Sequence, residues 1–126
     1  MESFASAGDF MDIRREAAPS IPGAEFERIA AAAAKTRPDF VRAAANAWNN
    51  GHPAGEQPSA FTGPVLILSG ADDPLITAEV VASAIAPRFD PAHSTVTEIG
   101  QASHWPHIER PAAVAGEIDR FLDKME

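Results

Sequence analysis

The chain has 126 residues, enough for one small domain, and 45% of them are hydrophobic, as in ordinary globular proteins. The net charge of −8 argues against binding to the phosphate backbone of nucleic acids, and the absence of cysteine excludes disulfides, thiolate metal sites and cysteine nucleophiles. The N-terminal residues do not resemble a signal peptide, and the longest strongly apolar run, 65–68, is too short to span a membrane. We therefore expect a cytoplasmic protein without membrane contact.

The sequence changes character near residue 60. A stretch rich in glycine and proline, residues 51–63, is typical of a loop or linker. Residues 1–60 are expected to form an irregular segment followed by a helical region. Residues 61–126 are expected to form a region of alternating strands and helices.

The start of the chain contains helix-breaking residues. Residues 1–23 end in a run with Pro19, Pro22 and Gly23, so we predict irregular structure with one helical turn over 11–16. A first helix is predicted from about Ala24, because apolar residues recur at helical spacing. These residues are Phe26, Ile29, Ala30 and Ala33.

A second helix is predicted from about Arg37. Thr36 and Asp39 resemble a capping box, and Pro38 is tolerated in the first turn of a helix. Asparagine and glycine end the helix near Gly51, because both accept the left-handed conformation of a helix C-terminus. Its apolar face would present Phe40, Val41, Ala44, Ala45 and Trp48. We expect the aromatic residues of both helices, Phe26, Phe40 and Trp48, to lie in a helical core.

The second region reads as strand, helix, strand, helix. The uninterrupted apolar run bounded by Pro64 and Gly70 is typical of a strand buried on both faces of a parallel sheet. Residues 94–100 are rich in β-branched residues and predict a second strand. Between them, Thr77 is expected to cap a helix over 78–86 that ends at Pro87. Its inward residues would be Val80, Val81, Ala84 and Ile85.

A last helix is predicted to begin at Pro111. Its apolar stripe comprises Val114, Ile118, Phe121, Leu122 and Met125. The fold class is therefore α/β, with two parallel strands and flanking helices. Two parallel strands do not form a stable sheet alone, so we expect an exposed edge that favours association.

Polar residues follow both predicted strands. Asp72 and Asp73 follow the first, and His104 and His107 follow the second. In parallel sheets, functional residues lie in loops after the carboxyl ends of strands, so an acid and a histidine from neighbouring strands can meet. The acid would orient the imidazole, which would act as a general base.

These motifs resemble the C-terminal portion of the α/β-hydrolase superfamily. The segment PVLILSGADDPLIT is similar to the family's seventh strand and acid loop, with its Gly-x-x-Asp pattern, and ASHWPHIERP is similar to its histidine loop. The final helix resembles the one that closes the fold, and the resemblance spans about residues 61–124. The preceding helices resemble the cap that this family inserts before the acid strand.

The resemblance implies roles for individual residues. Asp73 matches the catalytic acid and His104 the catalytic base, with Asp72 as the alternative acid if the loop is shifted by one residue. Trp105 would line the substrate pocket. Ser103 stands where the family usually has glycine. The motif's other two positions, Glu109 and Pro111, match the start of the last helix and are expected to be structural.

The nucleophile of the family has no counterpart in this sequence. It lies in Gly-x-Ser-x-Gly, and no serine here has those flanking glycines. The resemblance thus implies a portion of an esterase-, lactonase- or haloperoxidase-like hydrolase for small ester-like, acyl or apolar substrates. It would have little activity alone. A nucleophilic aspartate, as in dehalogenases or epoxide hydrolases, stays open.

Two other interpretations remain. The chain could be a non-catalytic remnant that binds a small ligand or a protein, and it could self-associate or pair with a complementing N-terminal half. A metal site would use His104, His107 and Asp73, but Pro106 separates the histidines and no second ligand cluster is present. We therefore expect neither a metal nor a cofactor.

Overall fold

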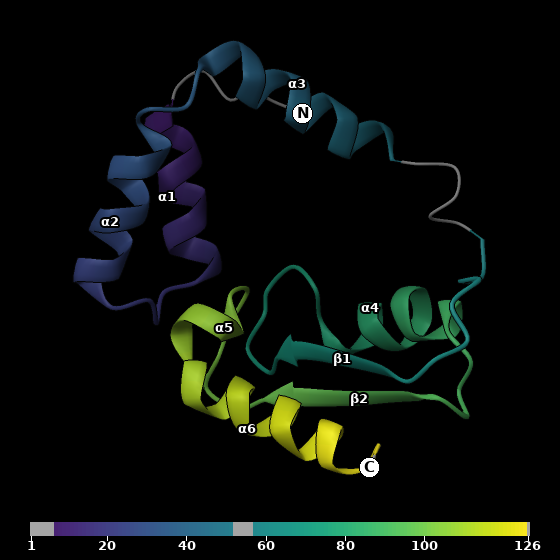
Figure 1. Cartoon of the computed structure of the whole chain (residues 1–126). Helices are drawn as coiled ribbons and strands as arrows, with labels where there is room; N and C mark the ends of the chain where they lie inside the picture. Colours follow the sequence, from purple (N-terminus) through teal and green to yellow (C-terminus); the bar gives the residue numbers. More distant parts are fainter. Residues whose placement is uncertain (1–6, 52–56, 126) are drawn as a thin grey trace. The chain divides into compact units, whose positions relative to one another are not determined.

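The computed structural model describes residues 7–51 and 57–125, which form two compact units, Met1–Gln57 and Pro58–Glu126. The first unit is helical, and the second combines helices with two parallel strands (Figure 1). The α/β class with two parallel strands is thereby confirmed. Among the described helices, none is long and apolar enough to cross a membrane.

The first unit begins with a longer helix than the sequence predicted. Helix α1 spans Ala7–Ala17, so the prediction of a mostly irregular segment is wrong over these residues. The segment is rich in residues that favour helix, and Arg14 and Arg15 lie in its last turn, where positive charge complements the helix dipole. Residues 1–6 lie outside the described part of the chain.

Helix α2 spans Gly23–Ala33, and its Phe26 is buried. The guanidinium carbon of Arg15 in α1 lies 3.8 Å from the centroid of the Phe26 ring. A cation over an aromatic face is attracted by the ring quadrupole. This contact links the first two helices of the unit.

Helix α3 spans Pro38–Asn50 and starts where predicted, but without the capping box. Arg37 is the N-cap residue and no side chain caps the helix; the Asp39 carboxylate instead pairs with the Arg37 guanidinium at 2.6 Å. The strong guanidinium–carboxylate attraction competes with the cap for the same carboxylate. Gly51 follows the helix, as predicted, and its φ of 65° is a value that favours glycine. Its ψ of −173° differs from that of the predicted left-handed helical conformation.

The apolar residues of α3 do not form the expected core. Phe40 is 70% exposed and Trp48 is 82% exposed, whereas Phe26 in α2 is only 6% exposed. The prediction is right for Phe26 and wrong for the other two. Helical spacing shows that residues share a face, but it does not show that another element covers that face.

In the second unit, strands β1 (Val65–Gly70) and β2 (Ser94–Ile99) pair in parallel. Gly100 lies beyond β2, so the strand ends one residue before the predicted limit. The register aligns Ser69 with Glu98 and Gly70 with Ile99, so both strands end at the same edge. The loops that follow them therefore start side by side.

The connection between the strands is a helix of changing geometry. Thr77 caps α4 (Ala78–Val80), its side-chain oxygen accepting the Val80 N–H at 3.3 Å, as predicted. The chain then winds as a π-helix, η2 (Val81–Ile85), and as a 3-10 helix, η3 (Ala86–Arg88). Pro87 therefore lies within η3 and does not end the helix, because proline is tolerated where no backbone N–H is needed. Of the predicted inward residues, Val81 is buried and Ala84 is exposed.

Two helices follow β2: the short α5 (Pro106–Glu109) and then α6 (Pro111–Asp123). Glu109 ends α5 and does not begin the last helix, which corrects its predicted place. Figure 1 shows α4 on one side of the strand pair and α6 on the other. The apolar stripe of α6 is partly open, because Ile118 is 41% and Leu122 is 49% exposed. Met125, which the sequence placed in the same stripe, lies beyond the end of α6.

Candidate active site

Asp73 lies in the loop after β1, and its carboxylate is held from two sides. Its Oδ1 accepts the backbone N–H groups of Leu75 and Ile76 at 2.8 and 2.9 Å. This pattern is the local turn that an aspartate side chain forms with the residues two and three positions on. The side chain is only 5% exposed, and the turn leaves Oδ2 for another partner.

That partner is His104, from the loop after β2. Its Nδ1 lies 2.9 Å from Asp73 Oδ2, across 31 residues of sequence. The imidazole side chain is 27% exposed. Because Nδ1 faces the carboxylate, the neutral ring carries its proton there, and Nε2 is the nitrogen with a free lone pair. This is the arrangement of a general base oriented by an acid.

The two loops are also joined by their backbones. The N–H of Ala71 donates to the carbonyl of Ile99 at 3.0 Å, and the N–H of Asp72 donates to the carbonyl of Ala102 at 2.9 Å. These bonds continue the strand pairing past the ends of β1 and β2. The acid loop and the histidine loop are therefore held together by backbone hydrogen bonds as well as by the contact between Asp73 and His104.

Gly70 makes this close approach possible. A Cβ atom at this position would lie 2.0 Å from the carbonyl oxygen of Ser103 and 2.5 Å from that of Ala102. Any side chain would push the histidine loop away from the acid loop. The glycine of the Gly-x-x-Asp pattern is thus explained by steric contact across the two strands.

Glu109 fixes the histidine loop from the other end. Its carboxylate accepts the N–H of Ser103 at 3.0 Å and the N–H of Trp105 at 3.1 Å, both at Oε1, and the Ser103 hydroxyl at 3.2 Å at Oε2. The residue is only 4% exposed. Glu109 therefore holds the residues on both sides of His104 by hydrogen bonds. Ser103 contributes two of these three bonds, one from its backbone N–H and one from its hydroxyl.

The environment of Asp73 favours its charged form. Burial raises the pKa of the Asp73 carboxyl, but the N–H donors of Ile76 and Leu75, together with His104, lower it, and the net result is below its ordinary value. Hydrogen bonds to the carboxylate thus outweigh its loss of water. Asp73 stays ionised, as an acid that orients an imidazole must.

The structure brings together two of the predicted site residues and leaves the others outside the pair. Asp73 and His104 meet, whereas Asp72 is exposed and uses only its backbone N–H in the loop. His107 is exposed on α5, and Trp105 is half-buried at the start of that helix. Within residues 7–51 and 57–125, no group of three His, Asp or Glu side chains could hold a metal ion.

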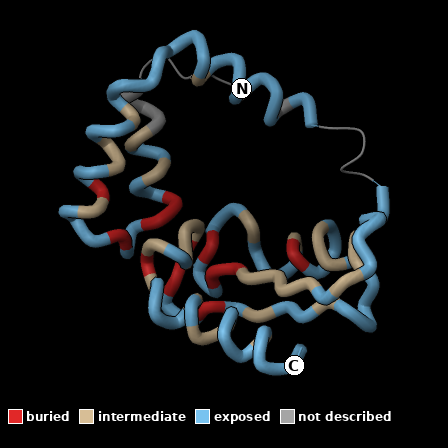
Figure 2. Tube along the Cα trace, viewed as in Figure 1, coloured by how far each residue is buried: buried red, intermediate tan, exposed pale blue. Residues whose placement is uncertain are grey.

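Sequence reasoning assigned Glu109 only a structural role in the last helix, and it gave no steric reason for Gly70. In the sequence, only the position of Glu109 within the histidine-loop motif, six residues after Ser103, indicates its role. Figure 2 shows buried chain at the carboxyl ends of the two strands. Buried residues there include Ser103, Glu109, Asp73 and Ala102.

Comparisons of the chain with protein-family models, with curated proteins and with solved structures found no match. The resemblance to α/β-hydrolases is therefore a resemblance of sequence motifs.

Proposed function

We propose that this chain supplies the acid and the base of a hydrolytic active site of the α/β-hydrolase type. In this proposal His104 Nε2 takes the proton of a nucleophile, and Asp73 holds the imidazole and stabilises its charged form. The substrate is a small ester-like, acyl or otherwise apolar molecule. The observation that carries the proposal is the 2.9 Å contact between His104 Nδ1 and Asp73 Oδ2.

Three further features support a catalytic role over an incidental contact. The acid is buried and ionised, and the imidazole is partly exposed, so Nε2 can reach another group. The two side chains come from loops at the same edge of a parallel sheet. Gly70 allows the two loops to approach closely, and Glu109 holds the histidine loop by hydrogen bonds.

The proposal places the nucleophile outside these 126 residues, since the sequence contains no Gly-x-Ser-x-Gly. The described sheet has only two strands, in the order β1-β2. Such a sheet is marginal unless further strands or other elements cover it. In our proposal a strand from the part that bears the nucleophile pairs with the open edge of β1. The chain alone then has little hydrolase activity, because the nucleophile and oxyanion donors supply much of the rate.

The test begins with the native protein, isolated from its source with an antibody to this chain. Its intact mass is compared with the 13.3 kDa of this sequence, and it is treated with a serine-directed fluorophosphonate and an aspartate-alkylating chloroalkane. We expect a label on a polypeptide that includes this chain or co-purifies with it. If the nucleophile is a serine, His104→Ala should slow fluorophosphonate labelling by about a hundredfold or more. If it is an aspartate, the ester that the chloroalkane forms on it should persist in His104→Ala, because no base activates the water that hydrolyses this ester.

His107→Ala is the matched control, because this histidine is exposed and lies outside the pair. It should label like the unaltered protein. A native mass of 13.3 kDa with no companion and no label would sink the proposal. So would labelling that His104→Ala leaves unchanged.

A further inference from the structure

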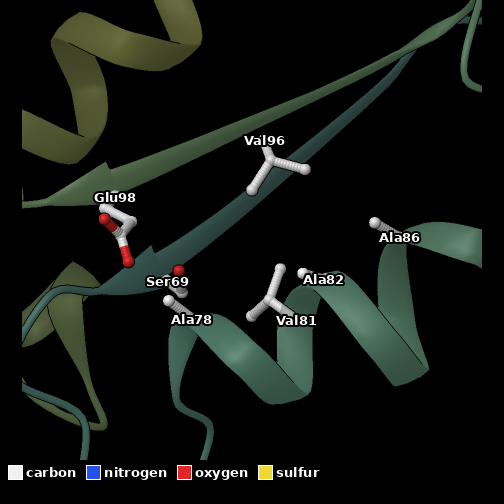
Figure 3. Close-up of a pocket in the computed structure, with 7 residues that line it drawn as sticks. All are labelled: Ser69, Ala78, Val81, Ala82, Ala86, Val96 and Glu98. Atoms are coloured by element: carbon white, nitrogen blue, oxygen red, sulfur yellow. The ribbon is translucent and has the colours of Figure 1, made fainter.

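A groove of about 470 Å³ lies between the strand pair and the helix that connects the strands (Figure 3). This volume falls within the roughly 300–1,000 Å³ of pockets that hold small molecules. Asp73 and His104 do not line it, so the groove is separate from the candidate active site. Its lining residues are Ser69, Ala78, Val81, Ala82, Ala86, Val96 and Glu98.

Strand alternation explains one wall of the groove. Ser69 of β1 is in register with Glu98 of β2, and Ile67 is in register with Val96. Alternate residues of a strand point to the same face, so Val96 and Glu98 share the face that carries Ser69. Figure 3 shows these three side chains on the face toward the connecting helix.

The helical wall is shaped to leave space. Three of its four lining residues are alanines, and Val81 points toward the sheet. The π-helix η2 begins at Val81, where the groove passes along the helix. Stretches of π-helix are rare, and they occur frequently at functional sites. Small side chains on a widened helix keep the groove from closing against the sheet.

Two polar groups face each other at one end of the groove. Ser69 is only 6% exposed, and its Oγ has no hydrogen-bond partner among the described residues. Glu98, its register partner, has an exposed carboxylate that forms no ion pair with any residue in the described ranges. Because Ser69 Oγ has almost no accessible surface, Ser69 belongs to the closed wall of the groove, and Glu98 is the polar group that a ligand can reach.

We propose that this groove binds a small primary amine with a compact apolar body. The ammonium group would pair with the Glu98 carboxylate, the charged group of the groove that a ligand can reach. The apolar body would lie along Val81, Val96 and the alanines of the helix. The carboxylate disfavours an anion, and the net charge of −8 also attracts cations. This proposal does not depend on the proposed hydrolase function.

The test is an NMR titration of the full chain with three ligands of similar shape. They are cyclohexylmethylammonium, the neutral alcohol cyclohexylmethanol and the anion cyclohexanecarboxylate. We expect the ammonium to shift the backbone amide signals of Ser69, Ala82 and Glu98 in a saturable way. The alcohol should bind about tenfold more weakly and the carboxylate should not bind, because only the ammonium pairs with Glu98.

Variants test the charge of Glu98 and the space of the groove separately. Glu98→Gln should weaken ammonium binding about tenfold, whereas Glu79→Gln, an exposed carboxylate on α4 outside the groove, should not. Ser69→Ala should leave ammonium binding unchanged, because the Ser69 hydroxyl has almost no accessible surface and does not reach the ligand. Ala82→Phe should fill the groove and abolish the amide shifts.

Three results would overturn the proposal. The first is an absence of saturable shifts at these amides in a chain whose spectrum shows that it is folded. The second is equal affinity for the alcohol and the ammonium, which would mean that Glu98 takes no part. The third is ammonium binding that survives both Glu98→Gln and Ala82→Phe, which would place the ligand elsewhere.

Discussion

The two units of the chain differ in what they bury. In the described part of the first unit, the buried residues are all apolar: Ala17, Ala18, Ile21 and Phe26. The second unit buries apolar residues too, but its buried polar residues are Ser69, Asp73, Ser103 and Glu109. Charged groups of the first unit pair at its surface instead, as in Arg28 with Glu25 and Arg37 with Asp39.

This difference shows that hydrogen bonds between buried polar groups fix the structure of the second unit more than that of the first. Burying a carboxylate is costly unless hydrogen bonds replace the lost water. The second unit meets this condition at Asp73 and at Glu109, each of which accepts several bonds. Apolar contacts tolerate small shifts, whereas such bonds require particular positions. The satisfied polar groups of the second unit therefore fix the positions of its loops more narrowly than apolar contacts alone would.

The strongest test of the contrast is Glu109→Ala. It removes the acceptor of the Ser103 and Trp105 N–H groups and of the Ser103 hydroxyl. We expect the free energy of unfolding, measured by urea denaturation of the full chain, to fall by about 3 kcal/mol, because buried donors lose their partner.

Glu109→Gln is its matched control. The amide oxygen can accept both N–H groups, and the amide nitrogen can donate to the Ser103 hydroxyl. We expect a loss of about 1 kcal/mol or less. Equal losses in the two variants would show that the charge, and not the hydrogen bonding, stabilises the loop.

A smaller effect is expected from Gly70→Ala. The added methyl group would collide with the carbonyl oxygens of Ser103 and Ala102, so we expect unfolding to become easier by about 2 kcal/mol. Gly116→Ala in α6 is the control, since the nearest atom to its Cβ, in the Arg120 side chain, lies 3.7 Å away. That change should stabilise the chain by about 0.5–1 kcal/mol. Two similar responses would contradict the steric role of Gly70.

The smallest effect is expected from Asp73→Asn, and it should depend on pH. The pKa of Asp73 is lowered in the folded chain, so its charged form stabilises the fold above the ordinary carboxyl pKa of about 3.9. We expect the variant to lose about 1–2 kcal/mol near pH 7. The difference in stability between the variant and the unaltered chain should shrink as the pH falls through the pKa of Asp73 in the folded chain. Urea denaturation at several pH values measures this difference.

Asp39→Asn in the first unit is the comparison. The guanidinium of Arg37 lowers the pKa of this exposed carboxyl, but water and salt screen the pair. We therefore expect no measurable pH-dependent loss of stability. A loss at Asp39 as large as that at Asp73 would remove the distinction between the two units.

Much of the second unit's fold could be predicted from the sequence, because its signals are local. The apolar run of β1, the β-branched residues of β2 and the Thr77 cap each depend on neighbouring residues. The π-helix at Val81–Ile85 could not be predicted, since its geometry depends on packing. The exposure of Phe40 and Trp48 could not be predicted either, because helical spacing does not show what covers a face.

For the candidate site, the sequence indicated the pairing of Asp73 with His104 but not the residues that maintain it. The pairing follows from two motifs at the ends of neighbouring strands. The role of Glu109 depends on α5 turning its carboxylate back onto Ser103 and Trp105. The role of Gly70 depends on a backbone approach that no residue pattern specifies.

The backbone bonds beyond the strands have a consequence for how the molecule folds. Ala71 and Asp72 bond to Ile99 and Ala102, so the pairing of β1 with β2 and the meeting of Asp73 with His104 belong to one cooperative step. Local opening that frees the imidazole must also break these bonds. The Asp72 amide should then exchange its hydrogen as slowly as amides within the strands, so that the site and the sheet open together.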